Sequence, residues 1–178
     1  MISIIIPFYS VDQEKYTILQ RCLKSLPSVE KIVVWNRKEG MAKAINEGAK
    51  CATGDYFLIM NDDVLLKSGD IRDLCVENTV VSPTFNGKEY PYLWGSCFCV
   101  PRSVWEEIGG MDERYSVSYF DDDDLIFTLQ RHGISMISQP SVVFDHPNPG
   151  RTLEALPDRN EFFNENQEKF KQKWGRLP

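Results

Sequence analysis

Short apolar runs alternate with segments of helical periodicity over the first sixty residues, and this alternation constrains the fold more than any other feature. Ser3 to Pro7, Lys31 to Trp35 and Tyr56 to Met60 have the composition of buried strands. Between them, Tyr16 to Leu26 and Gly40 to Ala52 carry apolar residues at helical spacing. Strand, helix, strand, helix, strand is typical of a parallel sheet with right-handed crossovers. We therefore expect an α/β fold with a mostly parallel, Rossmann-like central sheet flanked by helices.

The second half of the chain is less regular, and its apolar runs are shorter. Strands are expected at Gly95 to Val100, Ile134 to Ser138 and Ser141 to Phe144, and helices from Ser103, after Asp124 and from Asn160 to Trp174. Because the chain contains no internal repeat, low-complexity tract or linker, residues 1–178 are expected to form a single domain.

The bulk composition excludes several classes of protein. The net charge is −6, so nothing suggests electrostatic capture of nucleic acid. No run of about 18 apolar residues is present, which predicts no transmembrane segment. The N-terminus lacks the basic region of a signal peptide, and the five cysteines lack zinc-site spacing. We expect a cytoplasmic protein with reduced thiols, whose oligomeric state the sequence does not indicate.

Two acidic clusters carry the chemistry. Asp62 and Asp63 follow the third strand at the edge where ligands of such sheets bind, and Asp121 to Asp124 precede a helix. Either cluster alone could be structural, since Asp favours turns and helix caps. Together they suit Mg²⁺ or Mn²⁺, which can neutralise a diphosphate, and a carboxylate that takes a proton from an attacking hydroxyl.

Six segments, in this order, resemble family 2 glycosyltransferases with the GT-A fold, and the resemblance covers nearly the whole chain. They are SIIIPFYS, GMAKAINEGAKCATGDYFLIMNDDVLL, GSCFCVPRSVWEEIGGMDERY, YFDDDDLIFTLQRHG, VVFDHP and FKQKWG. The resemblance implies a small, minimal member of that family and a GT-A fold.

The resemblance also implies a metal site. Asp63 matches the last acid of the family's DxD-type motif, which binds Mn²⁺ or Mg²⁺. Asp62 matches the neighbouring residue that touches the donor ribose or the metal shell. His146 matches a histidine that in some relatives completes the metal shell or contacts the diphosphate, although a structural role is equally compatible with its position.

The catalytic base is assigned by register. When YFDDDDL is aligned on Leu125, Asp121 and Asp122 match the family's Glu-Asp pair, and Asp122 matches the base. Asp124 matches an acid with a structural role. If the helix begins near Asp123, Asp122 would be its N-cap and could face a cleft.

Further residues are implied to contact the two substrates. The donor would meet Pro7, Tyr9, Asn36, Arg37 and Lys43. The loop after the second strand is shorter than in most relatives, and Asn36 stands where an Asp is usual. Its amide can still offer a donor and an acceptor to a base edge.

Trp94 and Gly95 fall on the acceptor side, where a tryptophan can stack on a sugar ring or simply pack in the core. The predicted activity is metal-dependent transfer of a sugar from a nucleotide diphosphate donor, with a UDP-sugar favoured, to an acceptor hydroxyl, with inversion. The acceptor would be a glycan, a protein or another large molecule.

Two alternatives remain at this stage. A nucleotidyltransferase also uses an α/β sheet, acidic residues and Mg²⁺, but it normally has a glycine-rich basic loop after the first strand, which PFYSVDQEK is not. A non-catalytic nucleotide- or sugar-binding relative of the same fold is the other.

Overall fold

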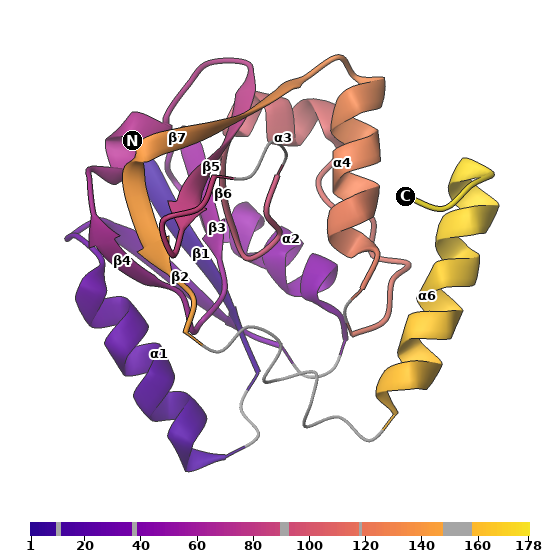
Figure 1. The fold of residues 1–178 in the computed structure, drawn as a ribbon, viewed down its shortest axis with the longest axis horizontal. Helices are drawn as coiled ribbons and strands as arrows, with labels where there is room; N and C mark the ends of the chain where they lie inside the picture. Colours follow the sequence, from indigo (N-terminus) through magenta and orange to yellow (C-terminus); the bar gives the residue numbers. More distant parts are fainter. Residues whose placement is uncertain (10–11, 37–38, 90–92, 118, 148–157) are drawn as a thin grey trace.

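The computed structural model describes residues 1–9, 12–36, 39–89, 93–117, 119–147 and 158–178, and these residues form a curled seven-stranded sheet with helices on both faces (Figure 1). The strand order is β2-β1-β3-β6-β5-β7-β4. The elements are β1 (Ile2–Phe8), α1 (Gln13–Ser25), β2 (Glu30–Trp35), α2 (Met41–Cys51), β3 (Tyr56–Met60), β4 (Leu65–Ser68), η1 (Ile71–Leu74), β5 (Thr79–Phe85), β6 (Cys97–Pro101), α3 (Arg102–Ile108), α4 (Asp121–Arg131), β7 (Ser135–Asp145) and α6 (Arg159–Trp174).

The first half of the chain forms the predicted parallel unit. Strand β1 pairs in parallel with β2 on one side and with β3 on the other. Strand β6 then runs antiparallel between β3 and β5, while β7 returns parallel to β5. Five strands therefore run in one direction, and only β6 and β4 oppose them. The prediction of a mostly parallel α/β sheet is confirmed.

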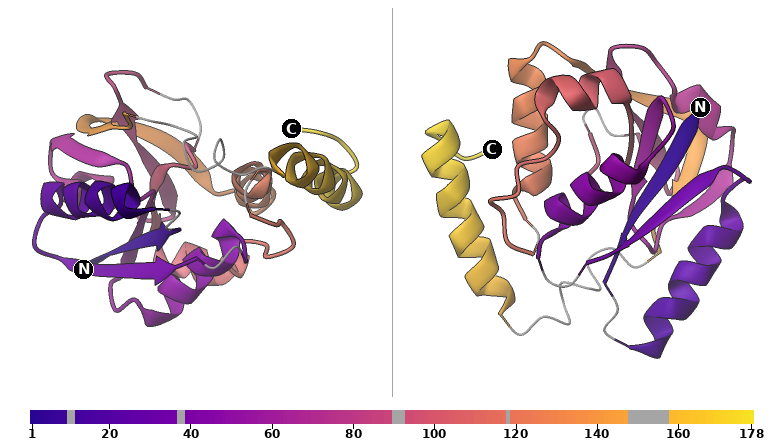
Figure 2. Two further views of the ribbon diagram at one scale, coloured as in Figure 1. Left: turned by 90° about the horizontal axis from the view of Figure 1, so that it is seen from below. Right: turned by 180° about the vertical axis from the view of Figure 1, so that it is seen from behind.

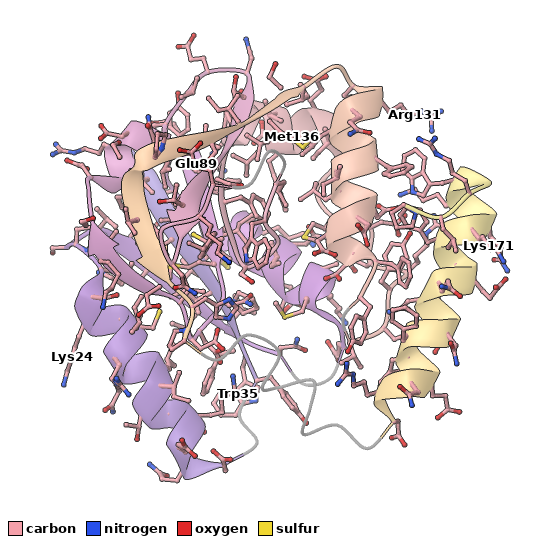
Figure 3. All side chains as sticks on the ribbon, viewed as in Figure 1. Lys24, Trp35, Glu89, Arg131, Met136 and Lys171 are labelled. Atoms are coloured by element: carbon pink, nitrogen blue, oxygen red, sulfur yellow. The ribbon has the colours of Figure 1, made fainter. Side chains whose placement is uncertain are left out.

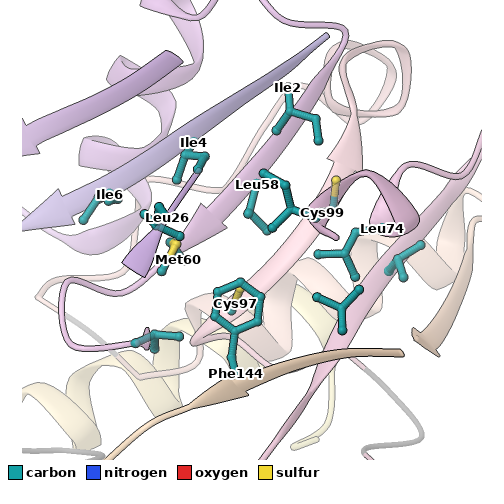
Figure 4. Packing of buried hydrophobic residues seen from close by; sticks show 14 of the residues in the cluster. Ile2, Ile4, Ile6, Leu26, Leu58, Met60, Leu74, Cys97, Cys99 and Phe144 are labelled. Atoms are coloured by element: carbon teal, nitrogen blue, oxygen red, sulfur yellow. The ribbon is translucent and has the colours of Figure 1, made fainter. Parts of the chain in front are cut away.

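Alternation along the strands gives each face of the sheet its own apolar layer. Ile4 and Ile6 of β1 face α1 and join the cluster shown in Figure 4, whereas Ile5 faces α2. On the second face, Leu125 and Leu129 of α4 pack into the same cluster as Ile5. Burial of both apolar faces stabilises the sheet, and close packing against the helices keeps it rigid. The residues that follow the strands are therefore held in fixed positions.

Three details differ from the sequence expectations. The two predicted runs after residue 133 form one strand, β7, whose pairing with β5 shifts register between Pro83 and Thr84 to accommodate the extra residues. Strands β4 and β5 were not predicted, because β4 is short and half-exposed and Pro83 interrupts the pattern of β5. Helix α4 begins at Asp121 rather than near Asp123.

Helix α6 lies beside α4, on the outside of the molecule (Figures 1 and 2). Phe170 and Trp174 of α6 contact Phe127 of α4, with ring centroids 5.2 and 5.3 Å apart. The five cysteines are free thiols in the structure. Among the described residues, none of the helices is long and apolar enough to span a membrane.

Candidate active site

The carboxyl ends of β1, β2 and β3 and the amino end of the antiparallel β6 bring the predicted residues to one edge of the sheet. The backbone N–H of Asn36, just after β2, donates to the Phe8 carbonyl at the end of β1 (2.8 Å). The N–H of Asn61, just after β3, donates to the carbonyl of Ser96, just before β6 (2.9 Å). These bonds place the predicted donor residues Pro7, Tyr9 and Asn36 on the same edge as the first acidic cluster.

Asn36 presents an unused acceptor at this edge. Its side chain is buried, and within the part of the chain that the structure describes its Oδ1 has no hydrogen-bond partner. Since buried polar atoms are nearly always paired, an unpaired one at a ligand-binding edge indicates a place where a ligand can donate. The geometry is compatible with the predicted contact between Asn36 and the donor.

Asp63 and His146 form a buried pair. The Nε2 atom of His146 lies 3.1 Å from Oδ1 of Asp63, and the two side chains are 6% and 11% exposed. The backbone N–H of His146, directly after β7, donates to Asn86 Oδ1 (3.2 Å) and fixes its position. In the described segments neither ring nitrogen makes a hydrogen bond of good geometry, so the imidazole remains available to another partner.

This pair fits one side of a divalent cation site. Two neighbouring ligand atoms on an octahedral cation, each at about 2.1 Å, lie about 3.0 Å apart, close to the separation of Nε2 and Oδ1. Among the described residues there is no group of three His, Cys, Asp or Glu side chains able to hold a metal ion. A cation held by Asp63 and His146 would therefore need oxygen ligands from a bound diphosphate and from water.

Asp62 has a different environment, which the sequence analysis missed. Both of its oxygens accept hydrogen bonds from Nζ of Lys15, at 2.9 and 3.1 Å. Burial raises the pKa of Asp62, whereas Lys15 favours its ionised form. Only the presence of a lysine on the buried face of the first helix could have indicated this pair.

Helix α4 carries the second acidic cluster in its first turn. The N-cap is Phe120, so the expectation that Asp122 caps the helix is wrong. A Cβ added to Gly95 would lie 2.7 Å from Oδ2 and 2.8 Å from Cβ of Asp122, so the absence of a side chain at Gly95 makes room for this carboxylate. The other oxygen of Asp122 accepts from the N–H of Asp123 (3.0 Å). Asp122 therefore faces the start of β6, next to the end of β3.

Asp124 faces away from this edge, because two helical positions correspond to about 200° around the axis. Its buried carboxylate accepts from Tyr115 Oη (2.8 Å), Trp174 Nε1 (2.7 Å) and Lys173 Nζ (2.8 Å). The bonds from Lys173 and Trp174 join α4 to α6 through the FKQKWG segment, and the bond from Tyr115 ties α4 to the loop that precedes it. Asp124 thus has a structural environment, in contrast to Asp122.

Burial and mutual repulsion raise the pKa values of the first acids of α4. Burial, followed by the charge of Asp122, raises the pKa of Asp121 to about 7. The pKa of Asp122 is raised by burial, and that of Asp123 is raised to about 6 by burial and the charge of Asp122. Neighbouring carboxyl groups that hold a proton near neutral pH are typical of sites that transfer protons.

The backbone before α4 is strained. Val117, Tyr119 and Phe120 have positive φ angles of 60°, 78° and 65°, which are unfavourable for residues with a Cβ. The side chain of Asn166 on α6 compensates by accepting from the N–H of Ser116 (3.0 Å) and donating to the carbonyls of Ser116 (2.8 Å) and Tyr119 (3.2 Å). Helix α6 therefore stabilises the turn that delivers Asp121 and Asp122.

Three other residues predicted to contact the substrates have surroundings that do not test those contacts. Lys43 forms an exposed ion pair with Glu39 (2.7 Å), and Arg37 lies outside the described residues. The ring of Trp94 stacks at a tilt on Phe85, with centroids 5.8 Å apart. The donor and acceptor contacts of Lys43, Arg37 and Trp94 remain predictions.

Comparison with solved structures identifies the architecture. The chain matches the Drosophila β-1,4-galactosyltransferase 7 mutant D211N in complex with manganese, UDP-Gal and xylobiose, with a TM-score of 0.62 and 14% identity, over 90% of this chain and 79% of that one. It also matches GalNAc-T7 with UDP, GalNAc and Mn²⁺, with a TM-score of 0.67 and 12% identity, over 82% of this chain and 43% of that one. The fold is GT-A.

Within this GT-A domain, residues 27–75 match the model of glycosyl transferase family 2, so the resemblance to that family is confirmed over the segment from the end of α1 to η1. A further match is the catalytic domain of Drosophila β-1,4-galactosyltransferase 7 with xylobiose, with a TM-score of 0.60 and 16% identity, over 85% of this chain and 72% of that one. No curated protein sequence matches the chain.

Proposed function

We propose that this GT-A domain, formed by residues 1–178, is a glycosyltransferase that moves a sugar from a nucleotide diphosphate donor to an acceptor hydroxyl with the help of Mn²⁺ or Mg²⁺. One arrangement carries the proposal. The buried pair Asp63–His146 and the carboxylate of Asp122 lie on the same edge of the sheet, since the Asn61 N–H donates to the Ser96 carbonyl and Asp122 packs against the neighbouring Gly95.

The donor would bind across the ends of β1, β2 and β3. Two solved structures with this fold hold UDP or UDP-Gal together with manganese, which supports a UDP-sugar as the donor. Asn36 would meet the base with its free Oδ1, beside Pro7 and Tyr9, and Asp63 and His146 would hold the cation. When bound, the cation supplies positive charge that stabilises the leaving diphosphate.

Asp122 would act on the acceptor. As the acceptor oxygen attacks the anomeric carbon, Asp122 takes its proton. Burial raises the pKa of Asp122 and so makes its carboxylate a stronger base, and Asp121 lies beside it in the first turn of α4. Gly95 and Trp94 at the start of β6 would border the acceptor. Because a direct displacement needs one base, we propose transfer with inversion. The acceptor would be a glycan, a protein or another large molecule that covers the open side of the site.

The metal role is tested with Asp63→Ala. We expect calorimetry to show Mn²⁺-dependent binding of UDP in the wild type and its loss in the variant. Asp55→Ala is the matched control, because Asp55 is an exposed aspartate at the opposite edge, paired with the N-terminal amine. Equal Mn²⁺-dependent affinity in the wild type and Asp63→Ala would remove Asp63 from the metal site.

The base is tested with Asp122→Asn, which keeps the shape of the side chain and removes its basicity. Hydrolysis of a panel of UDP-sugars in Mn²⁺ should slow by about 10²-fold or more, with UDP affinity unchanged. In Asp124→Asn, the same assay should show a much smaller loss of kcat together with a lower melting temperature. Normal turnover in Asp122→Asn would mean that Asp122 is not the base.

A further inference from the structure

Lys15 is a fully buried lysine in the first turn of α1, next to the proposed metal site. Its side chain is 2% exposed, and its Nζ lies 2.9 and 3.1 Å from the two oxygens of Asp62, whose side chain is 8% exposed. Lysine is almost never fully buried unless it is paired. The ammonium of Lys15 and the carboxylate of Asp62 therefore hold each other in position.

The pairing divides two consecutive carboxylates into different roles. Both oxygens of Asp62 are engaged by one ammonium, so Asp62 and Lys15 together carry no net charge. Asp63, the next residue, pairs instead with the imidazole of His146. Of the two acids after β3, only Asp63 has an oxygen facing His146, the other proposed ligand of the cation.

We propose that Lys15 is a positioning residue that withholds Asp62 from the cation and thereby keeps the affinity of the free protein for the cation low. This inference rests on the proposed function, because it concerns the same metal site. Affinity for hard cations rises with the number of charged oxygen ligands. With one carboxylate and one imidazole, the site binds the cation firmly only when a diphosphate adds its own oxygens.

The consequence for turnover is a coupled exchange of cation and nucleotide. After transfer, the nucleoside diphosphate must leave, and it would supply most of the oxygen ligands of the cation. A site that retained the cation with two carboxylates would also retain the product. Lys15 therefore favours product release.

Two substitutions of the pair should change metal affinity in opposite directions. Lys15→Met leaves the carboxylate of Asp62 free beside Asp63, so binding of Mn²⁺ alone should tighten by about tenfold, as expected for one added charge near the cation. Asp62→Asn leaves the ammonium without its partner, so binding of Mn²⁺ should weaken by a similar factor. The double variant Lys15→Met/Asp62→Asn replaces the ion pair by neutral groups and should bind Mn²⁺ within about threefold of the wild type.

The measurement is titration of each protein with Mn²⁺ alone, followed by the electron paramagnetic resonance signal of the free ion, at about pH 8 where carboxylates are ionised. The titration is repeated with UDP present. Lys24→Met is the matched control, because Lys24 lies on the same helix and points into solvent (Figure 3). This control removes the same charge and should leave both affinities unchanged.

Opposite shifts in the two single variants, cancelled in the double variant, support the proposal, since a merely structural ion pair would change the melting temperature and leave Mn²⁺ affinity alone. Unchanged Mn²⁺ affinity in Asp62→Asn, or equal weakening in both single variants, would overturn it. If Lys15→Met does not fold, Asp62→Asn and the double variant still decide. Loss of metal binding in Asp63→Ala combined with no shift in the Lys15 and Asp62 variants would refute this inference and leave the proposed function standing.

Discussion

Gly95→Ala should displace the carboxylate of Asp122, the proposed base, and leave the proposed metal site unchanged. The φ angle of Gly95 lies outside the left-handed range, so alanine is sterically acceptable for the backbone. The new Cβ would lie 2.7 Å from Oδ2 of Asp122, about 0.7 Å closer than the 3.4 Å of an ordinary contact. The carboxylate must therefore move by roughly that distance, at a cost in stability of about 1–3 kcal/mol.

A displacement of this size is enough to reduce catalysis, because misplacing a catalytic group by about 1 Å can cost about 10²-fold. We expect kcat for hydrolysis of a UDP-sugar to fall by about 10- to 100-fold in Gly95→Ala. Hydrolysis of the donor is the suitable assay because water then replaces the acceptor. The predicted contact between Gly95 and a large acceptor therefore does not affect the measured rate. Mn²⁺-dependent UDP affinity should stay within about twofold, because Asp63 and His146 are not displaced.

Gly133→Ala is the control for Gly95→Ala. Gly133 follows the other end of α4, and a Cβ there meets nothing within 4 Å, so its replacement costs backbone strain of about 1 kcal/mol at its φ of 71° without crowding any side chain. Its kcat should be that of the wild type. A Gly95→Ala enzyme that also kept the wild-type kcat would refute the argument that Gly95 sets the position of a catalytic Asp122.

Two further predictions concern the acidic helix and its support. Because the pKa of Asp121 is raised from 3.8 to about 7, the folded protein binds a proton that the unfolded chain has released, so its contribution to the free energy of unfolding falls as pH rises from about 4 to about 7. Asp121→Asn should reduce the fall in the free energy of unfolding across that range by up to about 4 kcal/mol, since a pKa difference of one unit corresponds to about 1.4 kcal/mol. Urea denaturation at a series of pH values measures this, and an unchanged pH dependence would contradict the shift. Trp174→Phe removes the 2.7 Å hydrogen bond to Asp124 and should lower the free energy of unfolding, measured by urea denaturation, by about 1–2 kcal/mol. Trp35→Phe is the control, because the ring of Trp35 is exposed on the edge strand β2, and it should change the free energy of unfolding much less. Equal losses in the two variants would argue against the stabilising role of the Trp174–Asp124 bond.

The sequence indicated the parallel half of the sheet well, because its strands are continuous apolar runs and each helix between them has a clear period. It indicated β5 poorly, since Pro83 interrupts the run, and it split β7 at Gln139-Pro140, where a register shift absorbs the irregularity. Local patterns do not report such tertiary compensation.

For the site, family register selected Asp122, and the structure shows that Asp122 and Asp124 face different surroundings. The role of Asp122 itself remains a prediction. The argument from helix capping failed, because the positive φ of Phe120 starts the helix two residues earlier than expected. Lys15 and Asp62 lie 47 positions apart in sequence, and the lysine on the buried face of the first helix does not by itself indicate which carboxylate it pairs with.

The strained turn before α4 is stabilised by hydrogen bonds from α6. Detachment of α6 would therefore open the structure locally at this turn. Three backbone groups of the turn are satisfied by the single side chain of Asn166, so detachment of α6 exposes them to water and releases the unfavourable φ angles together. The equilibrium between docked and detached α6 would then set the fraction of molecules in which the first turn of α4 is correctly placed. Hydrogen exchange at the amides of α4 should follow this opening rather than global unfolding, and low concentrations of urea should abolish turnover while the β1–β3 unit remains protected.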